Sequence, residues 1–267
     1  MSKNTLHKLR EKLVTLLTPE RLTNLSTVVA LVIVWYAIST IVHPLFLPSP
    51  AEVFGRSYFV YHDTLGSDIL YSLMRIVLGL VLGSLLGIGL GIAMSWSKIV
   101  EWWFDPIVEI VRPIPVLALI PLFILWFGIG ELGKILLIAF GVFVRQVVIT
   151  REAIKNVPSV YLKAAQTLGA TEKAQLFRTV IFPSITPEII GGLRVTVAAA
   201  FGYCAAAEFL GAQRGIGYMI IRARRYLYTF AVIFGIILFS SFSLIADRFV
   251  RYLDHRINIW TEREAQQ

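Results

Sequence analysis

The sequence predicts an all-α, polytopic membrane protein with six transmembrane helices, and three observations lead to this fold class. Hydrophobic residues make up 57% of the 267-residue chain and charged residues only 16%, which is too apolar a composition for a single soluble core. Six apolar segments each approach the roughly 20 residues needed to cross the hydrocarbon of a bilayer. Basic residues concentrate in alternate connections between these segments, as the positive-inside rule requires.

The apolar segments divide the chain into three regions. We expect a cytoplasmic amphipathic helix over residues 1–24, a six-helix transmembrane domain over residues 25–247 and a cytoplasmic tail over residues 248–267. Within the domain, the expected spans are Leu25–Val42, Leu70–Met94, Ile107–Phe127, Leu132–Ile149, Glu188–Leu210 and Leu227–Ile245.

The distribution of positive charge predicts the orientation. Leucines at helical spacing alternate with Lys and Arg over residues 1–24, which is typical of a basic helix on the cytoplasmic face of a bilayer. A cleaved signal peptide is the alternative, but no small-residue cleavage site follows the apolar segment. With the N-terminus inside, sixteen of the 25 Lys and Arg residues fall in cytoplasmic segments and six fall outside. We therefore expect both termini in the cytoplasm.

The second span carries a row of glycines at intervals of four residues, on one helical face. In lipid there is little hydrophobic drive between helices, so small residues that permit close backbone approach mark a packing seam. We expect helix packing along the row Gly79, Gly83, Gly87 and Gly91.

The stretch over residues 161–183 is polar and basic but lies between two apolar segments. It predicts two short helices joined by a turn. Gly169 supplies the left-handed residue that often ends a helix, Thr171 is expected to cap the second helix, and Pro183 is expected to end it. Small side chains on neighbouring turns let another surface approach, so we expect a docking element exposed to water. An ordinary cytoplasmic helical hairpin is the alternative.

This stretch resembles the EAA loop of permease subunits of bacterial ATP-binding-cassette (ABC) importers, which seats in a groove of the ATPase subunit. The resemblance is carried by Lys163–Ala165, Gly169 and Ile181–Pro183. The sequence departs from the family pattern by having Lys163 in place of the leading glutamate and one extra residue between Gly169 and Pro183. The resemblance implies that the residues coupling to an ATPase are Lys163, Ala164, Ala165, Leu168, Gly169 and Pro183.

The third span contains three prolines close together. Each proline removes a backbone donor, and broken helix is tolerated at membrane depth only beside protein or a water-filled cavity. The stretch from Arg112 to Glu131 closely resembles permeases of the taurine, aliphatic sulfonate and nitrate importer group. We expect a translocation pathway or gate that involves Arg112, Pro113, Pro115 and Pro121.

The fifth span ends in a carboxylate within a run of small residues. A carboxylate near the end of such a helix normally faces a cavity or a partner charge. Glu208, followed by Arg214–Gly217, is similar to the corresponding motif of the permease family, and both a structural salt bridge and a pathway role remain open. Near the start of the same span, Arg194 is expected to extend to the inner surface.

Three arginines after the fifth span lie on the expected outer side, against the usual charge bias. Clustered positive charge raises the local concentration of anions and their association rate. We expect attraction of an anionic solute, or of an acidic face of a binding protein, by Arg222, Arg224 and Arg225. Binding of lipid headgroups or pairing with Glu208 is the alternative.

Several function classes are excluded or disfavoured. Gly128–Lys134 matches most of a phosphate-binding loop, but both flanks are apolar spans and Ile135 stands where Ser or Thr is required. A single cysteine, Cys204, excludes a disulfide or cysteine metal site within one chain. The four histidines fall in different segments, so neither a catalytic constellation nor a metal site is expected. The net charge of +8 follows from the positive-inside bias, and no nucleic-acid role is expected.

The resemblance implies the transmembrane subunit of an ATP-driven importer in a bacterial inner membrane, with the type I ABC importer permease fold, and not an enzyme. It implies that separate ATPase subunits hold ATP and Mg²⁺, and that this chain binds no cofactor. The other implied partners are a periplasmic or lipid-anchored solute-binding protein and a second permease copy, which together with this chain forms a homodimer surrounded by membrane lipid. The solute is expected to be a small anion such as a sulfonate, taurine or nitrate. An ion-coupled carrier or channel is the competing class, but the internal repeats and buried ionisable relays typical of carriers are not evident. A membrane-embedded enzyme would need a convergent polar site.

Overall fold

A computed structural model of the protein describes residues 19–257, and every regular element in this part of the chain is helical. Within these residues, four helices are long and apolar enough to cross a membrane: Pro50–Trp96, Glu131–Lys155, Lys173–Phe209 and Thr229–Ile257. The bent pair Lys98–Val111 and Val116–Phe127 can form a fifth span, and Ser26–Ile41 is a shorter apolar helix. The expectation of an all-α, polytopic membrane protein is confirmed.

The helices follow one another with short connections. In chain order they are α2 (Pro19–Ile41), α3 (Pro50–Trp96), α4 (Lys98–Val111), η1 (Val116–Leu119), α5 (Ile120–Phe127), α6 (Glu131–Lys155), α7 (Ser159–Thr167), α8 (Lys173–Leu176), η2 (Phe177–Ile181), α9 (Phe182–Gly211), α10 (Ile216–Arg225) and α11 (Thr229–Ile257). The expected amphipathic helix over residues 1–24 and tail over residues 248–267 lie largely outside the described residues, although α11 extends to Ile257.

The chain forms two units. The first unit contains residues 19–62 and 223–234 of the described chain. Within it, Thr229 Oγ1 donates a hydrogen bond to the carbonyl of Leu45 at 2.5 Å, and the rings of Phe54 and Phe234 meet edge to face at 6.0 Å. These contacts join the start of α11 to the α2–α3 connection and to the start of α3.

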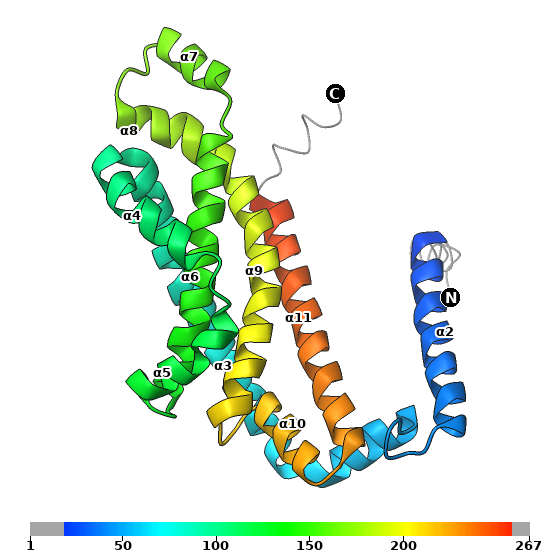
Figure 1. Ribbon diagram of the computed structural model, residues 1–267. Coiled ribbons are helices and arrows are strands. Elements are labelled where there is room, and N and C mark those ends of the chain that lie inside the picture. Colours follow the sequence, from blue (N-terminus) through cyan, green and yellow to red (C-terminus); the bar gives the residue numbers. More distant parts are fainter. Residues whose placement is uncertain (1–18, 258–267) are drawn as a thin grey trace. The chain divides into compact units, whose positions relative to one another are not determined.

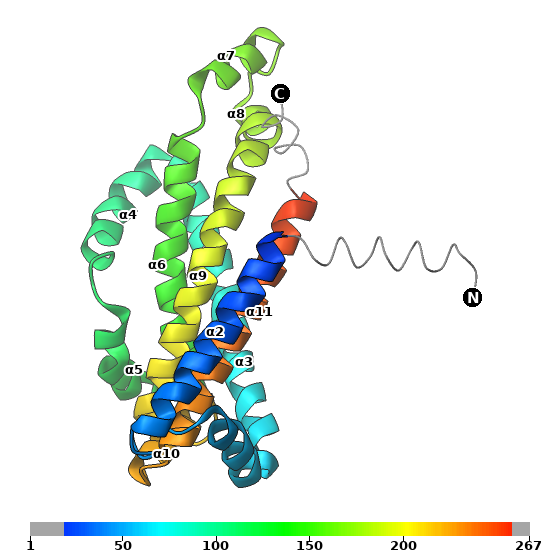
Figure 2. The same ribbon diagram turned by 90° about the vertical axis from the view of Figure 1, so that its right-hand side faces the viewer.

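The second unit contains residues 63–222 and 235–257 of the described chain, and α6 and α9 run side by side through it (Figures 1 and 2). Buried apolar side chains from several helices meet around α6. One cluster holds Ile120, Phe123, Leu137 and Ala207, and another holds Met94, Val108 and Val147. Helix α6 is therefore the element against which α3, α4, α5 and α9 bury their apolar faces.

The glycine row of α3 lies directly against α6. A Cβ atom built on Gly79 would lie 2.5 Å from Ile138 Cγ2, and one built on Gly87 would lie 2.7 Å from the carbonyl oxygen of Phe143. At Gly91 the nearest atom would be Thr150 Cβ at 2.7 Å, and at Gly83 it would be the carbonyl oxygen of Ala139. Real Cβ atoms do not approach other atoms this closely. The backbones of α3 and α6 can therefore lie this close together only because these four positions of α3 are glycine.

The proline-rich stretch breaks the third apolar segment into two helical arms, as predicted. Helix α4 ends at Val111, η1 begins at Val116, and the two arms are bent by 90°. Pro113 and Pro115 lie in the link, whereas Pro121 lies in the first turn of α5, where its missing N–H has no helical partner to lose.

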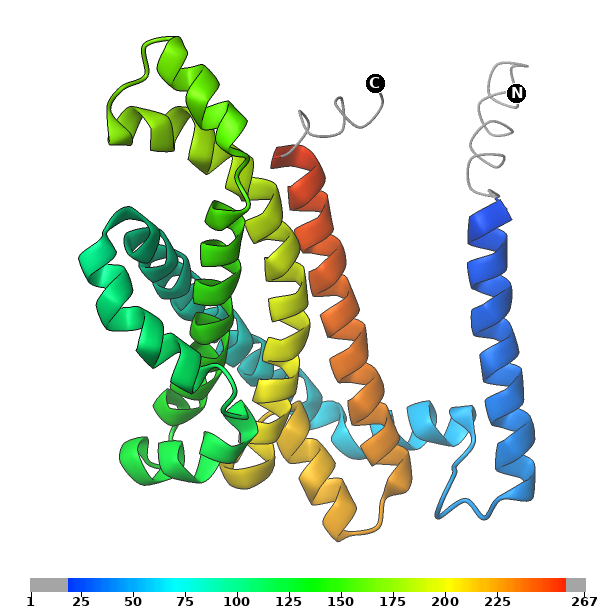
Figure 3. The ribbon, with the colours of Figure 1, turned by 45° about the horizontal axis from the view of Figure 1, so that its top comes forward.

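Helices α7 and α8 form a hairpin that projects beyond the ends of α6 and α9 (Figures 1 and 3). Gly169 has φ +97°, so the left-handed turn after α7 is confirmed. Two expectations about the second helix are wrong. Glu172 rather than Thr171 is its N-cap residue, and Pro183 does not end it, because the π-helical turn η2 leads directly into α9 and places Pro183 in the first turn of α9. A proline is tolerated in a first turn, so α8, η2 and α9 continue without a stop.

Arg194 has a partner that the sequence did not predict. Its Nε donates to Asp247 Oδ1 of α11 at 3.1 Å, and both side chains are about one third exposed. The guanidinium therefore links α9 to α11, and its extension to the inner surface stays a prediction.

Candidate functional site

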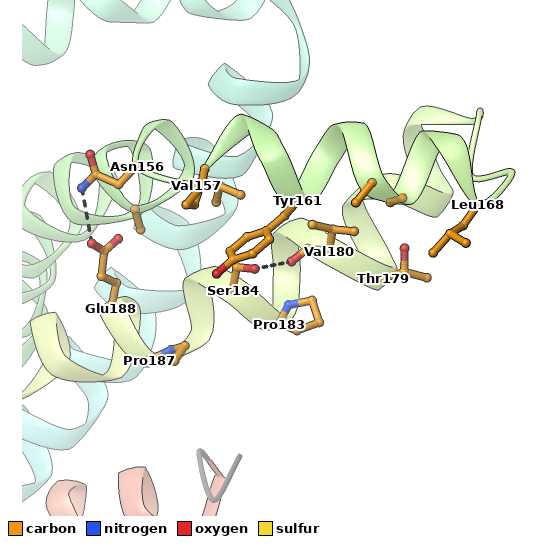
Figure 4. Close-up of a pocket in the computed structure, with 14 residues that line it drawn as sticks. Asn156, Val157, Tyr161, Leu168, Thr179, Val180, Pro183, Ser184, Pro187 and Glu188 are labelled. Carbon is orange, nitrogen blue, oxygen red and sulfur yellow. Dashed lines mark hydrogen bonds between the residues drawn. The ribbon is translucent and has the colours of Figure 1, made fainter. Parts of the chain in front are cut away.

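The α7–α8 hairpin presents an open groove of 660 Å³ (Figure 4). One wall is formed by α7 and the other by η2 and the start of α9. Tyr161 points from α7 toward Val180 and Ser184 across the groove, and Asn156 Nδ2 donates to Glu188 Oε1 at 3.3 Å at its inner end. Residues of both arms of the hairpin, from Tyr161 to Leu168 and from Thr179 to Pro183, therefore contribute to the same groove.

The tip of the hairpin exposes apolar side chains. Leu168 is 89% exposed, and Val160 and Tyr161 are more than half exposed. Lys163 and Ala164 are exposed and Ala165 is half-buried at the mouth of the groove, whereas Pro183 lines its far wall. An exposed leucine next to small residues at the end of a projecting hairpin is typical of a surface that another protein covers.

At the other end of α9, a buried guanidinium joins three segments. Arg75 of α3 is fully buried, and its Nε and Nη2 donate to the two carboxylate oxygens of Glu131 at 2.5 and 2.7 Å. Its Nη1 donates to Glu208 Oε1 at 2.5 Å and to the carbonyl of Arg214 at 2.8 Å. One side chain therefore holds the first residue of α6, the end of α9 and the α9–α10 loop together.

Glu208 is saturated with hydrogen bonds. Besides Arg75, it accepts from Ser72 Oγ at 2.7 Å, from the backbone N–H of Gly217 at 2.7 Å and from the thiol of Cys204 at 3.3 Å. A buried carboxylate is tolerated only when paired and hydrogen-bonded in this way. The salt bridge that the sequence left open for Glu208 is therefore present, and it is made with Arg75.

The α9–α10 loop is fitted to this carboxylate. Gly215 has φ +126°, and a Cβ built there would lie 2.5 Å from Glu208 Oε2. The N–H of Gly215 donates to Asp68 Oδ1 at 2.8 Å, and the N–H of Ile216 donates to Ser72 Oγ at 2.9 Å. Asp68, Ser72 and Arg75 thus present one face of α3 to the loop.

Sequence reasoning missed Arg75 and Glu131. Neither residue is among the site residues predicted from the sequence. The available signal was the arginine itself, because an ionisable residue within an apolar span normally has a buried partner.

The remaining predicted residues occupy two places. Arg112, Pro113 and Pro115 line a cavity of 750 Å³ together with residues of α6 and α9, whereas Pro121 does not line it. The three arginines expected in an outer loop lie instead in the last turns of α10, where Arg222 lies 5.8 Å from the ring centroid of Tyr218 and Arg224 and Arg225 are exposed.

Residues 76–259 match the family model described as the inner membrane component of binding-protein-dependent transport systems. This match covers more than half of the chain. The chain belongs to this family. It is a permease subunit of a binding-protein-dependent ABC importer, which is not itself an enzyme, and the ATPase is a separate subunit.

Named relatives extend over most of the permease. The taurine transport system permease protein TauC of Escherichia coli is 36% identical over 245 residues, covering 89% of this chain and 89% of that protein. The putative aliphatic sulfonates transport permease protein SsuC of Bacillus subtilis is 34% identical over 215 residues, covering 80% of this chain and 78% of that protein.

A solved structure agrees on the fold. An amino acid ABC transporter crystallised with histidines superposes with a TM-score of 0.65 at 20% identity, covering 75% of this chain and 97% of that chain. At this identity the similarity shows the fold of the permease and not its solute.

Proposed function

We propose that this permease forms the translocation path for a small anionic solute of the taurine and sulfonate type, delivered by a solute-binding protein. The two relatives described above, which are named for taurine and aliphatic sulfonates, are the observation that carries this proposal. The Arg112–Pro115 link beside the 750 Å³ cavity supports it, because a broken helix that lines a cavity is the usual form of a substrate pathway in membrane transporters.

The proposed assembly has two copies of the permease and two ATPase subunits. In each permease copy, α2 and the bent α4–α5 pair are the first and third of six spans in a type I importer fold. The N- and C-termini face the cytoplasm of a bacterial cell, and the chain itself binds no cofactor. The hairpin of residues 161–183 faces the ATPase, so the Arg75–Glu131–Glu208 cluster at the opposite end of α9 faces the outside. About 26 residues of helix separate Phe182 from Glu208, which corresponds to about 40 Å along the helix axis.

Coupling to the ATPase is proposed to occur through the hairpin, at Lys163, Ala164, Ala165, Leu168, Gly169 and Pro183. Its exposed Leu168 supplies apolar contact area at the tip. Because α8, η2 and α9 form one continuous helical path, a displacement of the tip is transmitted to α9 without an intervening flexible loop.

The outer ends of the spans are proposed to form a gate that Arg75 holds in register with Glu208. A guanidinium that binds three segments at once fixes their relative positions, since separating them would leave a buried charge unpaired. The exposed arginines Arg224 and Arg225, with Arg222, are proposed to attract the anion or the binding protein, and the glycine row to hold α3 against α6.

The solute is tested in vesicles that contain the permease, its ATPase and its binding protein. We expect ATP-dependent uptake of radiolabelled taurine or ethanesulfonate, with competition by other sulfonates and none by a neutral amino acid such as methionine. Uptake of methionine with no competition by any sulfonate would overturn the proposed solute while leaving the permease assignment intact.

The docking role is tested by co-purification of the ATPase. Leu168→Asp places a charge on the exposed tip and is expected to lower recovery of the ATPase at least tenfold, whereas Leu168→Met keeps an apolar side chain of similar size and is expected to retain it. Equal recovery with both variants would remove the hairpin from the interface.

A further inference from the structure

The 750 Å³ cavity is partly open and is lined by three segments of the second unit. The proline link supplies Val111–Leu117, α6 supplies one face from Phe140 to Glu152, and α9 supplies Gly192, Val195 and Tyr203. Its size falls in the range of small-molecule sites, which is roughly 300–1,000 Å³. Its lining is mainly apolar, with polar groups at a few positions.

Arg145 lines this cavity but was not among the pathway residues predicted from the sequence. It lies inside α6, ten residues before the end of a helix that crosses the membrane, and its side chain is half-buried and lines the cavity. Within residues 19–257 the structure gives its guanidinium no ion pair and no hydrogen bond, unlike Arg75 and Arg151. A charge inside a span without a partner in its own chain normally faces water or a ligand.

The other charges of the cavity leave it positive. Arg112 and Glu152 form a loose pair at 3.9 Å, with both side chains more than half exposed. The two arginines and one glutamate give the lining a net charge of +1. This balance suits a monovalent anion and does not favour a cation.

Tyr203 faces the same space from α9. Its ring packs on Gly141 of α6, where a built Cβ would lie 2.5 Å from ring atom Cε2. Gly141 therefore provides room for the ring. The phenolic hydroxyl has no hydrogen-bond partner within the described chain and is free to donate to an oxygen of a bound anion.

We propose that Arg145 and Tyr203 form an anion-binding site within the permease, which holds the sulfonate group of the solute during its passage. The guanidinium presents parallel N–H donors that match two oxygens of a tetrahedral oxyanion, and it is weakly hydrated compared with an ammonium group. The tyrosine donates to the third oxygen. The class of ligand rests on the proposed function, but the site itself rests on the cavity and its unpaired charge.

The site is tested by equilibrium binding of radiolabelled ethanesulfonate to the complex of permease and ATPase, in nanodiscs and without the binding protein. We expect Arg145→Gln to weaken binding at least tenfold and Arg145→Lys to weaken it less. We expect Tyr203→Phe to weaken binding about three- to tenfold, because the phenol supplies one hydrogen bond whereas the guanidinium supplies two and the opposite charge. Arg248→Gln changes an exposed arginine of α11 outside the cavity and is expected to leave binding unchanged. Ethyl methyl sulfone, a neutral molecule of similar shape, is expected to compete poorly.

Different failures have different meanings. No binding to the parent complex, or equal binding by Arg145→Gln, overturns the site even if sulfonate uptake is normal. Normal binding with no uptake of any sulfonate overturns the proposed solute but leaves the site in place. Binding that occurs in phosphatidylcholine nanodiscs and is abolished by phosphatidylglycerol would identify the ligand as a lipid phosphate, which also overturns the proposal.

Discussion

The charge on Glu208 can be removed with little change in shape by Glu208→Gln, and the structure allows the cost to be worked out. The glutamine keeps an acceptor for Ser72 or for the N–H of Gly217, but it loses the charge that faces Arg75. Arg75 retains Glu131, so the loss is that of one charge-assisted contact within a buried pair rather than of the whole pair. We expect a loss of stability of about 3 kcal/mol, which is the lower end of the cost of breaking a buried ion pair.

Cys204 provides the assay. It is the single cysteine of the chain, it is fully buried, and its thiol contacts Glu208. A maleimide dye can therefore label it only after this end of α9 opens. A loss of about 3 kcal/mol raises the population in which this end of α9 is open about 150-fold. The labelling rate of each variant, divided by the rate for the same variant unfolded in detergent, should rise by the same factor.

A matched control is Arg251→Gln, which removes an exposed ion pair with Asp247 on α11. Exposed pairs contribute about 0–1 kcal/mol, so its labelling rate should stay within about fivefold of the parent. A labelling rate for Glu208→Gln that matches this control would refute the view that the Arg75 cluster holds the end of α9.

Three further predictions use other contacts. Gly87→Ala should destabilise the protein by about 1–3 kcal/mol, because its Cβ would meet the backbone of α6. The control Gly89→Ala lies on the same helix, and its Cβ would have nothing within 4 Å, so it should be neutral or stabilise the protein by up to about 1 kcal/mol. Equal melting temperatures of the two variants would contradict the packing of the glycine row on α6. Arg151→Met should speed proteolysis within Lys98–Val111 several-fold, because Arg151 donates to both Glu101 and Asp105 of α4, and unchanged cleavage would show that apolar contacts alone hold α4. Gly169→Val should reduce recovery of the ATPase, because a β-branched residue does not fit φ +97° at the hairpin turn. It should leave the labelling rate of Cys204 unchanged, because a Cβ at this turn would contact nothing within 4 Å. A changed labelling rate would show that the substitution unfolds more than the hairpin.

Much of the fold could be predicted from sequence because lipid imposes simple local rules. Length and apolarity identify the spans, since each backbone polar group in hydrocarbon must be satisfied within a helix. The same local logic located the break at Pro113 and Pro115 and the left-handed turn at Gly169. These features depend on residues that are neighbours in the chain.

The missed features depend on residues far apart in the chain. Arg75 lies 56 positions from Glu131 and 133 from Glu208, and no periodicity connects them. Arg194 and Asp247 are separated by 53 positions. The continuation of η2 into α9 at Pro183 was missed for a different reason. A proline ends a helix only when its missing N–H and its ring cannot be accommodated, and Pro183 lies in the first turn of α9, directly after a π turn. Arg145 lies within the expected span Leu132–Ile149, but its place in the cavity depends on Arg112–Pro115 and on Tyr203, which are distant in the sequence.

The central claim is that the permease moves its solute only when an ATPase acts on the hairpin of residues 161–183. The most direct measurement is uphill accumulation of radiolabelled ethanesulfonate in vesicles that hold the permease and binding protein, with and without the ATPase. The account predicts accumulation only with the ATPase and ATP, and its loss in Leu168→Asp. Accumulation driven by a proton or sodium gradient in vesicles that lack the ATPase would contradict the account.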